Sequence, residues 1–173
     1  MIKQERELKK LALISVSDKT KITEFAQSLI KNGYQIIATG NTAKLLAENN
    51  ISVTEISSIT GFPEIFDGRV KTLHPKIFGG ILFRRDNQSD IKQASVNSID
   101  AIDVVCVNLY PFVKTASNPN SSLDDIIENI DIGGPSLVRA SAKNYKFVSI
   151  LTNPNQYDSF LQELDKGSVS LET

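Results

Sequence analysis

The sequence contains one cysteine, one histidine and no tryptophan among its 173 residues. Cys106 has no second cysteine with which to form an internal disulfide, and it lies in the apolar run 102–107, which is typical of a small buried thiol. This use of cysteine fits a reducing compartment, so we expect a cytoplasmic location. One cysteine and one histidine also cannot supply the clustered ligands of a zinc or iron site, so we expect no metal.

Long apolar runs and excess charge are also missing. No run approaches the roughly 18 apolar residues that a membrane-spanning helix needs, so no membrane segment is predicted. The formal net charge is −1, which gives the chain no general attraction for nucleic acid. Neither the GxGxxG motif of dinucleotide-binding domains nor a P-loop motif occurs. The length is typical of a single domain, which we predict to span 1–173.

Short apolar runs alternate with segments of helical period along the chain. Such alternation predicts an α/β fold in which a mostly parallel sheet is flanked by helices, because the crossovers between parallel strands cover the faces of the sheet. The run at 100–110 is the most apolar, and we expect it to be the central strand. The predicted strands are 11–16, 34–39, 51–56, 100–110 and 146–151, and the predicted helices are 22–30, 42–50, 76–82, 122–130, 133–144 and 153–167.

Polar, turn-forming motifs follow three of the predicted strands: SVSDK, ATGNT and NLYP. Because the carboxyl ends of parallel strands lie along one edge of a sheet, these motifs are predicted to converge. Ser17 and Thr42 stand where helices begin, which directs backbone N–H groups toward the same edge. Each motif alone is more typical of an ordinary helix cap. Together they favour a phosphate site for a mononucleotide or a sugar phosphate.

The segment GRVKTLHPK lies in a long irregular region, 59–85, and long ordered loops are often functional. If the segment is extended, Arg69 and Lys71 point to the same side and face one anion. His74 precedes Pro75, which favours a structural role at a turn over a catalytic one. The other basic residues of this region are interpreted as a solvated face: Lys76, Arg84 and Arg85.

A second polar motif, NIDIGGPSLVRASAKN, opens a predicted helix. Gly133 and Gly134 permit close approach of the backbone, and Asp131 stands just before the helix. Arg139 and Lys143 are four residues apart and share one helical face. Two interpretations stay open on this pattern alone, a cap carboxylate with an exposed basic face or part of a binding site.

Taken together, SVSDKT, TGFPEIFDGRVKTLHPK, NLYPF and ENIDIGGPSLVRASAKN resemble the inosine monophosphate (IMP) cyclohydrolase domain of the bifunctional purine biosynthesis proteins. The resemblance covers about 11–160. It implies a methylglyoxal-synthase-like, three-layer α/β domain that closes 5-formamidoimidazole-4-carboxamide ribonucleotide to IMP with loss of water, without a cofactor. It also implies a homodimer. Family members carry a formyltransferase domain beyond this region in the same chain, and the present sequence stops where that domain would begin.

The resemblance also implies roles for individual residues. A proton donor or acceptor is implied at Lys143, with further residues around the reacting groups at Lys71, Tyr110 and Asp131. The implied substrate contacts are Ser17, Asp18, Lys19, Thr39, Gly40, Asn41, Thr42, Arg69, Val70, Lys71, Thr72, Val107, Asn108, Asp131, Ile132, Gly133 and Gly134.

Two departures from the family pattern are visible. Asn41 stands where the family commonly has a second glycine in a TGGT-like loop, and Phe78 stands where many relatives have a histidine before the Gly-Gly pair. Asparagine tolerates left-handed backbone better than most residues, so we expect the loop to persist, and we interpret the histidine as dispensable. A nucleotide-sensing regulatory module of the same fold is the alternative function, but it would not need Lys71, Tyr110, Asp131 and Lys143 together. Methylglyoxal synthase would need a catalytic carboxylate and histidine in motifs that this chain lacks.

Overall fold

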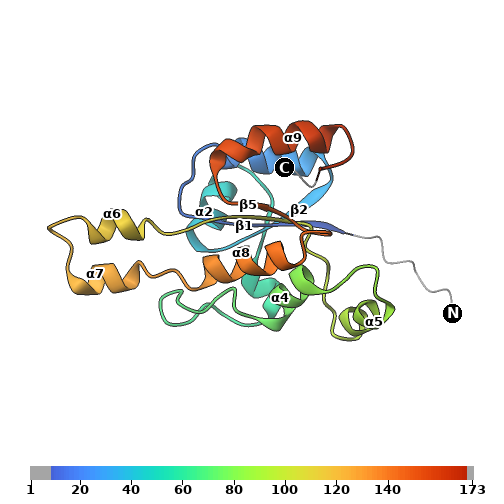
Figure 1. The fold of residues 1–173 in the computed structure, drawn as a ribbon, viewed down its shortest axis with the longest axis horizontal. Coiled ribbons are helices and arrows are strands. Elements are labelled where there is room, and N and C mark those ends of the chain that lie inside the picture. The colour runs from blue at the N-terminus through green and yellow to red at the C-terminus, as the bar shows by residue number, and fades with distance from the viewer. Residues whose placement is uncertain (1–8, 171–173) are drawn as a thin grey trace.

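The computed structural model describes residues 9–170, within which five strands form one sheet (Figure 1). The strand order is β3-β2-β1-β4-β5, and every neighbouring pair is parallel. The direction of the chain across the sheet reverses at β1, because β2 lies on one side of it and β4 on the other. The strands are β1 (Lys10–Val16), β2 (Tyr34–Ala38), β3 (Val53–Glu55), β4 (Val104–Asn108) and β5 (Ser149–Leu151).

Helices cover both faces of the sheet, which gives three layers and confirms the predicted fold class (Figure 1). Residues of α1, α2 and α9 pack on one face, and residues of α3, α4 and α8 pack on the other. The helices are α1 (Ile22–Lys31), α2 (Gly40–Glu48), α3 (Ile56–Thr60), α4 (Pro75–Leu82), α5 (Gln88–Val96), α6 (Phe112–Ala116), α7 (Leu123–Glu128), α8 (Gly133–Lys143) and α9 (Tyr157–Asp165), with a 3-10 turn at Pro154–Gln156.

The strand β1 contributes side chains to the hydrophobic clusters on both faces of the sheet. Ala12 and Ile14 belong to the cluster beneath α1 and α9, whereas Leu11 and Leu13 belong to the cluster beneath α4 and α8. Successive side chains of a strand point to opposite faces, so a continuous apolar run is what a strand covered on both sides requires. In the cluster beneath α1 and α9, the rings of Phe25 and Tyr157 stack with centroids 4.3 Å apart.

Several expectations about single elements are corrected by the structure. The central strand is β1, not β4, although β4 is paired on both sides. Both strands are apolar on both faces, so hydropathy does not distinguish them. The polar stretch after Arg85 contains the helix α5, which the sequence did not predict because Ala94 is its one buried residue. The short helices α3 and α6 were also not predicted.

The helices predicted at 76–82 and 122–130 correspond to α4 and α7, and the start of each has a local cause. The His74 imidazole accepts a hydrogen bond from the Lys76 N–H and so caps α4, which is a structural role. Ser122 and Asp125 form a reciprocal capping box at the start of α7.

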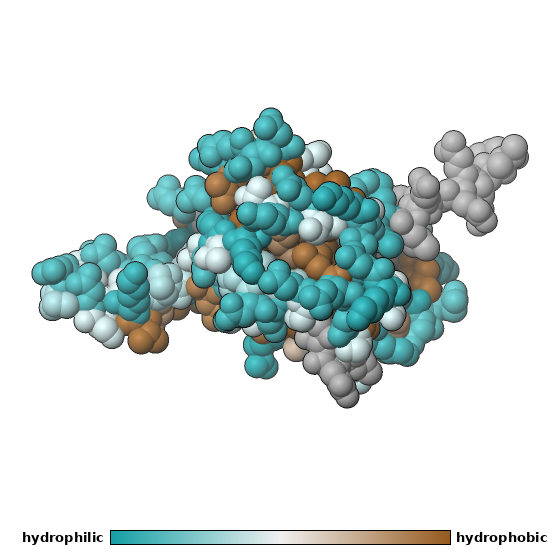
Figure 2. Space-filling view, turned by 90° about the horizontal axis from the view of Figure 1, so that it is seen from above, coloured by the Kyte–Doolittle hydropathy of each residue, from teal (hydrophilic) through white to brown (hydrophobic). Residues whose placement is uncertain are grey.

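Residues 109–132 form an arm that projects from the body and carries α6 and α7 (Figure 1). The arm stands clear of the rest of the molecule in the space-filling view, with polar and apolar residues at its surface (Figure 2). Its exposed apolar side chains show that it does not pack into either core. They are Leu109, Tyr110, Phe112, Val113, Leu123, Ile127, Ile130 and Ile132.

Arg85 is not the solvated residue that its sequence context suggested. Its guanidinium is mostly buried and pairs with Asp103 at 2.8 Å, while it also donates to the carbonyls of Ile102 (2.6 Å) and Phe147. Asp103 in turn accepts the Leu11 N–H at 3.0 Å. Burial raises the pKa of the Asp103 carboxyl, opposed by the Leu11 N–H and by the charge of Arg85. The pair therefore ties β1 and the approaches to β4 and β5 together at the edge of the sheet where those strands begin.

Removing this pair should destabilise the fold. Asp103→Ala leaves Arg85 charged and largely buried without its carboxylate, so we expect the free energy of unfolding to fall by about 2–3 kcal/mol. Asp158→Ala is the matched control, because its ion pair with Lys21 is more than half exposed and should contribute at most about 1 kcal/mol. Urea titration of both variants measures the difference, and equal losses would contradict the structural role of the buried pair.

Candidate active site

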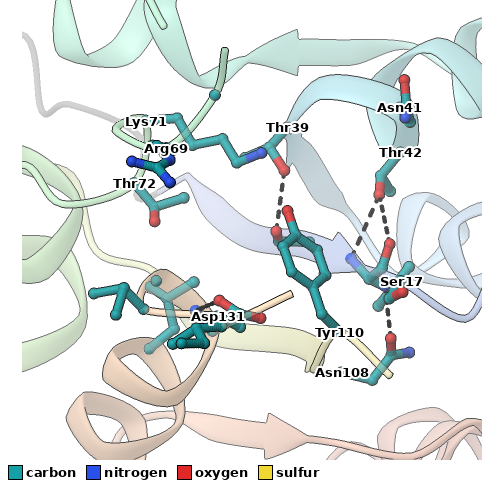
Figure 3. Close-up of a pocket in the computed structure, with 18 of the residues that line it drawn as sticks. Ser17, Thr39, Asn41, Thr42, Arg69, Lys71, Thr72, Asn108, Tyr110 and Asp131 are labelled. Atoms are coloured by element: carbon teal, nitrogen blue, oxygen red, sulfur yellow. Dashed lines mark hydrogen bonds between the residues drawn. The ribbon is translucent and has the colours of Figure 1, made fainter. Parts of the chain in front are cut away.

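A cleft of about 660 Å³ lies at the carboxyl ends of β2, β1 and β4, between the loop 61–74 and the base of the arm (Figure 3). This is the edge at which the sequence motifs were predicted to converge, and it includes the point at which the chain direction reverses in the sheet. The convergence of the three strand ends is therefore confirmed.

Asn108, the last residue of β4, organises the loop that follows β1. Its side-chain oxygen accepts the N–H groups of Ser17 at 2.6 Å and Asp18 at 2.8 Å, and its amide donates to the Asp18 carbonyl at 3.0 Å. Ser17 is thereby held against the cleft (Figure 3). The Asp18 carboxylate instead accepts two hydrogen bonds from Thr20, which lower its pKa, and it does not line the cleft.

The helix α2 presents its amino end to the cleft. Thr39 precedes the helix without capping it, because its hydroxyl is hydrogen-bonded to Ser15 at 3.0 Å. The Thr42 hydroxyl likewise turns away, donating to the Val16 carbonyl at 3.2 Å. The first N–H groups of α2 therefore have no side-chain cap, and they point with the positive end of the helix toward the cleft. This arrangement suits an anion such as a phosphate.

Two lysines stand beside the amino end of α2. The Lys71 ammonium lies close to Gly40, since a Cβ built on that glycine would be 3.9 Å from it. The Lys19 ammonium donates to the Val16 carbonyl. Burial lowers the pKa of Lys19, the nearby Lys71 charge lowers it further, and Asp18 opposes both effects. An anion bound beside Lys19 would oppose both effects and stabilise its charged form.

The loop 61–74 carries the basic motif into the cleft. An antiparallel bridge between Ile65 and Val70 closes a hairpin whose tip residues Phe66, Asp67 and Gly68 all have positive φ, at 56°, 52° and 85°. Such backbone is strained for an aromatic residue, so the tip is held by its surroundings. The hairpin leads into the wall of the cleft formed by Arg69, Lys71 and Thr72 (Figure 3).

Asp131 stands at the amino end of α8. One of its carboxylate oxygens accepts the Gly134 N–H at 2.7 Å, which fixes the side chain at the cleft wall. The two glycines have no room for a side chain: a Cβ on Gly133 would lie 2.8 Å from the Thr72 hydroxyl, and one on Gly134 would lie 2.7 Å from Leu109 and would overlap Asp131. Tyr110 extends from the end of β4 into the same cleft (Figure 3).

Most of the expected site residues line this cleft. They are Ser17, Lys19, Thr39, Asn41, Thr42, Arg69, Lys71, Thr72, Asn108, Tyr110, Asp131, Ile132, Gly133 and Gly134. Four expected contacts lie just outside the lining, Asp18, Gly40, Val70 and Val107, and Val107 is buried in the core.

Lys143 is not brought to the cleft of its own chain. It is exposed at the last position of α8, nine residues beyond Gly134, and at 100° per residue it points to the opposite side of the helix from that glycine. Tyr110, Asp131 and Lys71 are therefore together in one chain, whereas Lys143 and Arg139 lie on the outer surface.

The sequence did not point to several residues of the lining. The arm supplies Ile127, Glu128 and Ile130, and a usable clue was that the predicted helix 122–130 runs directly into Asp131. Among residues 9–170 no group of three His, Cys, Asp or Glu side chains is placed to hold a metal ion, and no helix there is long and apolar enough to cross a membrane. The remaining residues of the lining are Ser15, Val16, Asp67, Gly68, Leu73 and Leu137.

Comparison with known proteins agrees with the fold. Residues 21–136 match the protein family described as the MGS-like domain, which is two thirds of the chain. The chain belongs to the MGS-like domain family. A solved structure, described as the crystal structure of ForH, superposes with a TM-score of 0.80 at 35% sequence identity, and the match covers 95% of this chain and 84% of that one.

This MGS-like domain is also similar to curated proteins named bifunctional purine biosynthesis protein PurH. It is 60% identical to that of Persephonella marina over 94% of the chain, 55% identical to that of a Thermoanaerobacter species over 95%, and 53% identical to that of Bacillus cereus over 96%. The chain spans about a third of the length of these relatives. The resemblance to the amino-terminal domain of this protein, noted in the sequence, is confirmed.

Proposed function

We propose that this MGS-like domain is an IMP cyclohydrolase that closes 5-formamidoimidazole-4-carboxamide ribonucleotide to IMP with loss of water. The observation that carries the proposal is that Lys71, Tyr110 and Asp131 line one cleft beside an uncapped helix terminus, in a chain 60% identical to a PurH protein. A cleft of about 660 Å³ suits a mononucleotide. Formyl transfer is assigned to the part of the PurH proteins that this chain does not match.

The charges of the cleft suggest how the nucleotide would lie. Its phosphate fits among Lys19, the first N–H groups of α2 and the Arg69 guanidinium, where the positive helix end and cationic side chains act together. The base then extends toward Asp131 and Tyr110, past the apolar side chain of Ile132. Asn41, which replaces a family glycine, is exposed at the first turn of α2 and lines the cleft without closing it.

The reaction requires proton transfers and stabilisation of an oxyanion. A carboxamide nitrogen is a weak nucleophile that must lose a proton as it attacks the formyl carbon, while negative charge develops on the formyl oxygen. Lys71 can stabilise that oxygen as a cation, and the Asp131 oxygen not used for capping can accept the amide proton. The formyl oxygen takes up two protons, one from the carboxamide nitrogen and one from the formamido nitrogen, and leaves as water. Tyr110 can donate a hydrogen bond to this oxygen as it leaves. No redox step is involved.

Lys143 enters the proposal through a second copy of the chain. Because it lies on the outer surface of α8 in its own chain, it can exchange a proton with the substrate only in the cleft of a neighbouring copy. The proposed enzyme is therefore a homodimer in which each site is completed by its partner. We place this activity in the cytoplasm.

A spectroscopic assay tests the proposed activity. Purified protein mixed with the formamido ribonucleotide should change the ultraviolet spectrum as the purine ring closes, without an added cofactor or metal, because every group required is supplied by the protein. If the ribonucleotide binds in calorimetry while its spectrum stays unchanged, the chain is a nucleotide-binding module rather than an enzyme.

A further inference from the structure

One ion pair spans the mouth of the cleft. The Arg69 guanidinium donates to both oxygens of the Glu128 carboxylate, from Nε at 3.2 Å and from Nη2. Arg69 belongs to the hairpin loop and Glu128 is the last residue of α7, so the pair joins two elements that line the same cleft. Both side chains are more than half exposed, at 60% and 58%, so the pair is open to solvent and to ligands.

Within residues 9–170, this pair is the one side-chain hydrogen-bonded link from α7 to the body of the molecule. The other side-chain hydrogen bonds of α7 stay within the arm, between Ser122 and Asp125 and between Asn129 and Asp125. Opening the pair would therefore free the arm from the hairpin loop at this point without breaking another such bond.

The charged residues of the cleft balance one another. Three cations and three carboxylates line it, and two of the carboxylates are already engaged. Asp131 caps α8, and Glu128 occupies Arg69. An anionic ligand therefore meets an arginine whose two best-aligned donors are taken by a carboxylate. Exposed ion pairs of this kind are weak, whereas a phosphate dianion is a stronger bidentate partner for a guanidinium.

We propose that Glu128 is a built-in competing anion that holds Arg69 in the unliganded cleft and yields it to the phosphate of the bound nucleotide. This inference rests on the proposed function for the identity of the ligand. It makes Glu128 a specificity-determining residue, because Arg69 becomes available only to ligands that carry enough negative charge to displace a carboxylate. It also couples ligand binding to the release of the arm, since the same exchange opens the link between α7 and the hairpin loop.

The first test measures how tightly a charged and an uncharged ligand bind to variants in which one charged side chain is replaced by an uncharged one. In Glu128→Gln the competing charge is lost while the side-chain shape is kept, so calorimetry should show about three- to tenfold tighter binding of IMP, the effect expected of one charge near a protein surface. Binding of inosine, which lacks the phosphate, should stay within about twofold. In the Arg69→Ala background the gain from Glu128→Gln should disappear. Weaker binding of IMP to Glu128→Gln would overturn the proposal, because Glu128 would then support the ligand.

Asp124→Asn is the matched control. Asp124 lies one turn earlier on α7, and its side chain makes no hydrogen bond or ion pair with any of the described residues, so its replacement changes the net charge equally without touching Arg69. Its effect on IMP binding should stay within about twofold. An equal gain in Asp124→Asn would overturn the proposal, because the effect would then come from the general field of the arm.

A second test needs no ligand. Hydrogen exchange over residues 111–130 should be faster in Glu128→Gln and in Arg69→Ala than in the unaltered protein, because either change removes the link from α7 to the hairpin loop. Unchanged exchange in both variants would overturn the proposal. A protein that binds no IMP but shows the faster exchange would refute the proposed function and support the link, so the two failures are distinguishable.

Discussion

Replacement of Lys71 by methionine is expected to lower the turnover number by about 10²–10⁴-fold, while the affinity for the nucleotide falls by no more than about tenfold. The Lys71 ammonium lies beside Gly40 and lines the cleft together with Asp131 and Tyr110. Its charge is proposed to act most strongly on the oxyanion that develops during ring closure, so the loss appears in the transition state rather than in ground-state binding. Steady-state kinetics and calorimetry on the same variant separate the two effects.

The control for this variant is Lys44→Met, which removes the same charge from an exposed position of α2 that does not line the cleft. Its turnover should stay within about twofold of the unaltered enzyme. If Lys71→Met retained turnover, Lys71 would be a binding residue only.

A mixture of the Lys71→Met and Lys143→Ala variants tests the shared site, because a mixed dimer can combine one intact Lys71 and one intact Lys143 in the same cleft. Failure of the mixture to regain activity would contradict the partner role of Lys143.

Gly134→Ala should lower both stability and activity. The added methyl group would lie 2.7 Å from Leu109 and would overlap Asp131, so the carboxylate must leave the Gly134 N–H that it now accepts at 2.7 Å. Overpacking together with a lost cap should reduce the free energy of unfolding by about 2–4 kcal/mol. The displaced Asp131 should reduce kcat/KM by about 10²-fold, because a small misplacement of a reacting group is costly.

Gly80→Ala separates the two effects of that substitution. Its Cβ would lie 2.6 Å from the backbone oxygen of Asp100, so a comparable loss of stability is expected, but Gly80 lies in α4 and does not line the cleft. At a temperature where both variants are folded, Gly80→Ala should keep its kcat/KM. Thermal unfolding followed by kinetics gives both quantities. Equal kinetic losses in the two variants would show that the activity effect of Gly134→Ala is only a loss of folded protein.

The elements that could be predicted from the sequence are those with local causes. Alternation of apolar runs and helical segments predicted the parallel sheet, and the helices predicted at 76–82 and 122–130 correspond to α4 and α7. The order of the strands has no such local cause, so the choice of 100–110 as the central strand was wrong. The helix α5 was invisible to periodicity because it buries only Ala94.

The residues of the candidate site likewise include some that could be predicted from the sequence and some that could not. Residues at the ends of β1, β2 and β4 could be predicted to lie close together, because the geometry of a parallel sheet places those ends at one edge. Glu128 belongs to the predicted helix that runs into Asp131, which was a clue to its position, but nothing local indicates that it pairs with Arg69 of the hairpin loop. The resemblance implied Lys143 as a residue of the site, but a motif does not say whether its side chain reaches the cleft of its own chain, and Lys143 does not line that cleft.

The position of the arm has a consequence for how the domain can vary. Tyr110 and Asp131 lie at the two ends of the arm 109–132, so two of the four candidate catalytic residues stand where the arm joins the body. Insertions or deletions at its tip, near residues 118–121, are separated from the cleft by α6 and α7 and should leave the chemistry unchanged. By contrast, a protein or chain segment that binds and moves the arm would displace Tyr110 and Asp131 together. Binding at the arm could therefore change the geometry of the candidate active site.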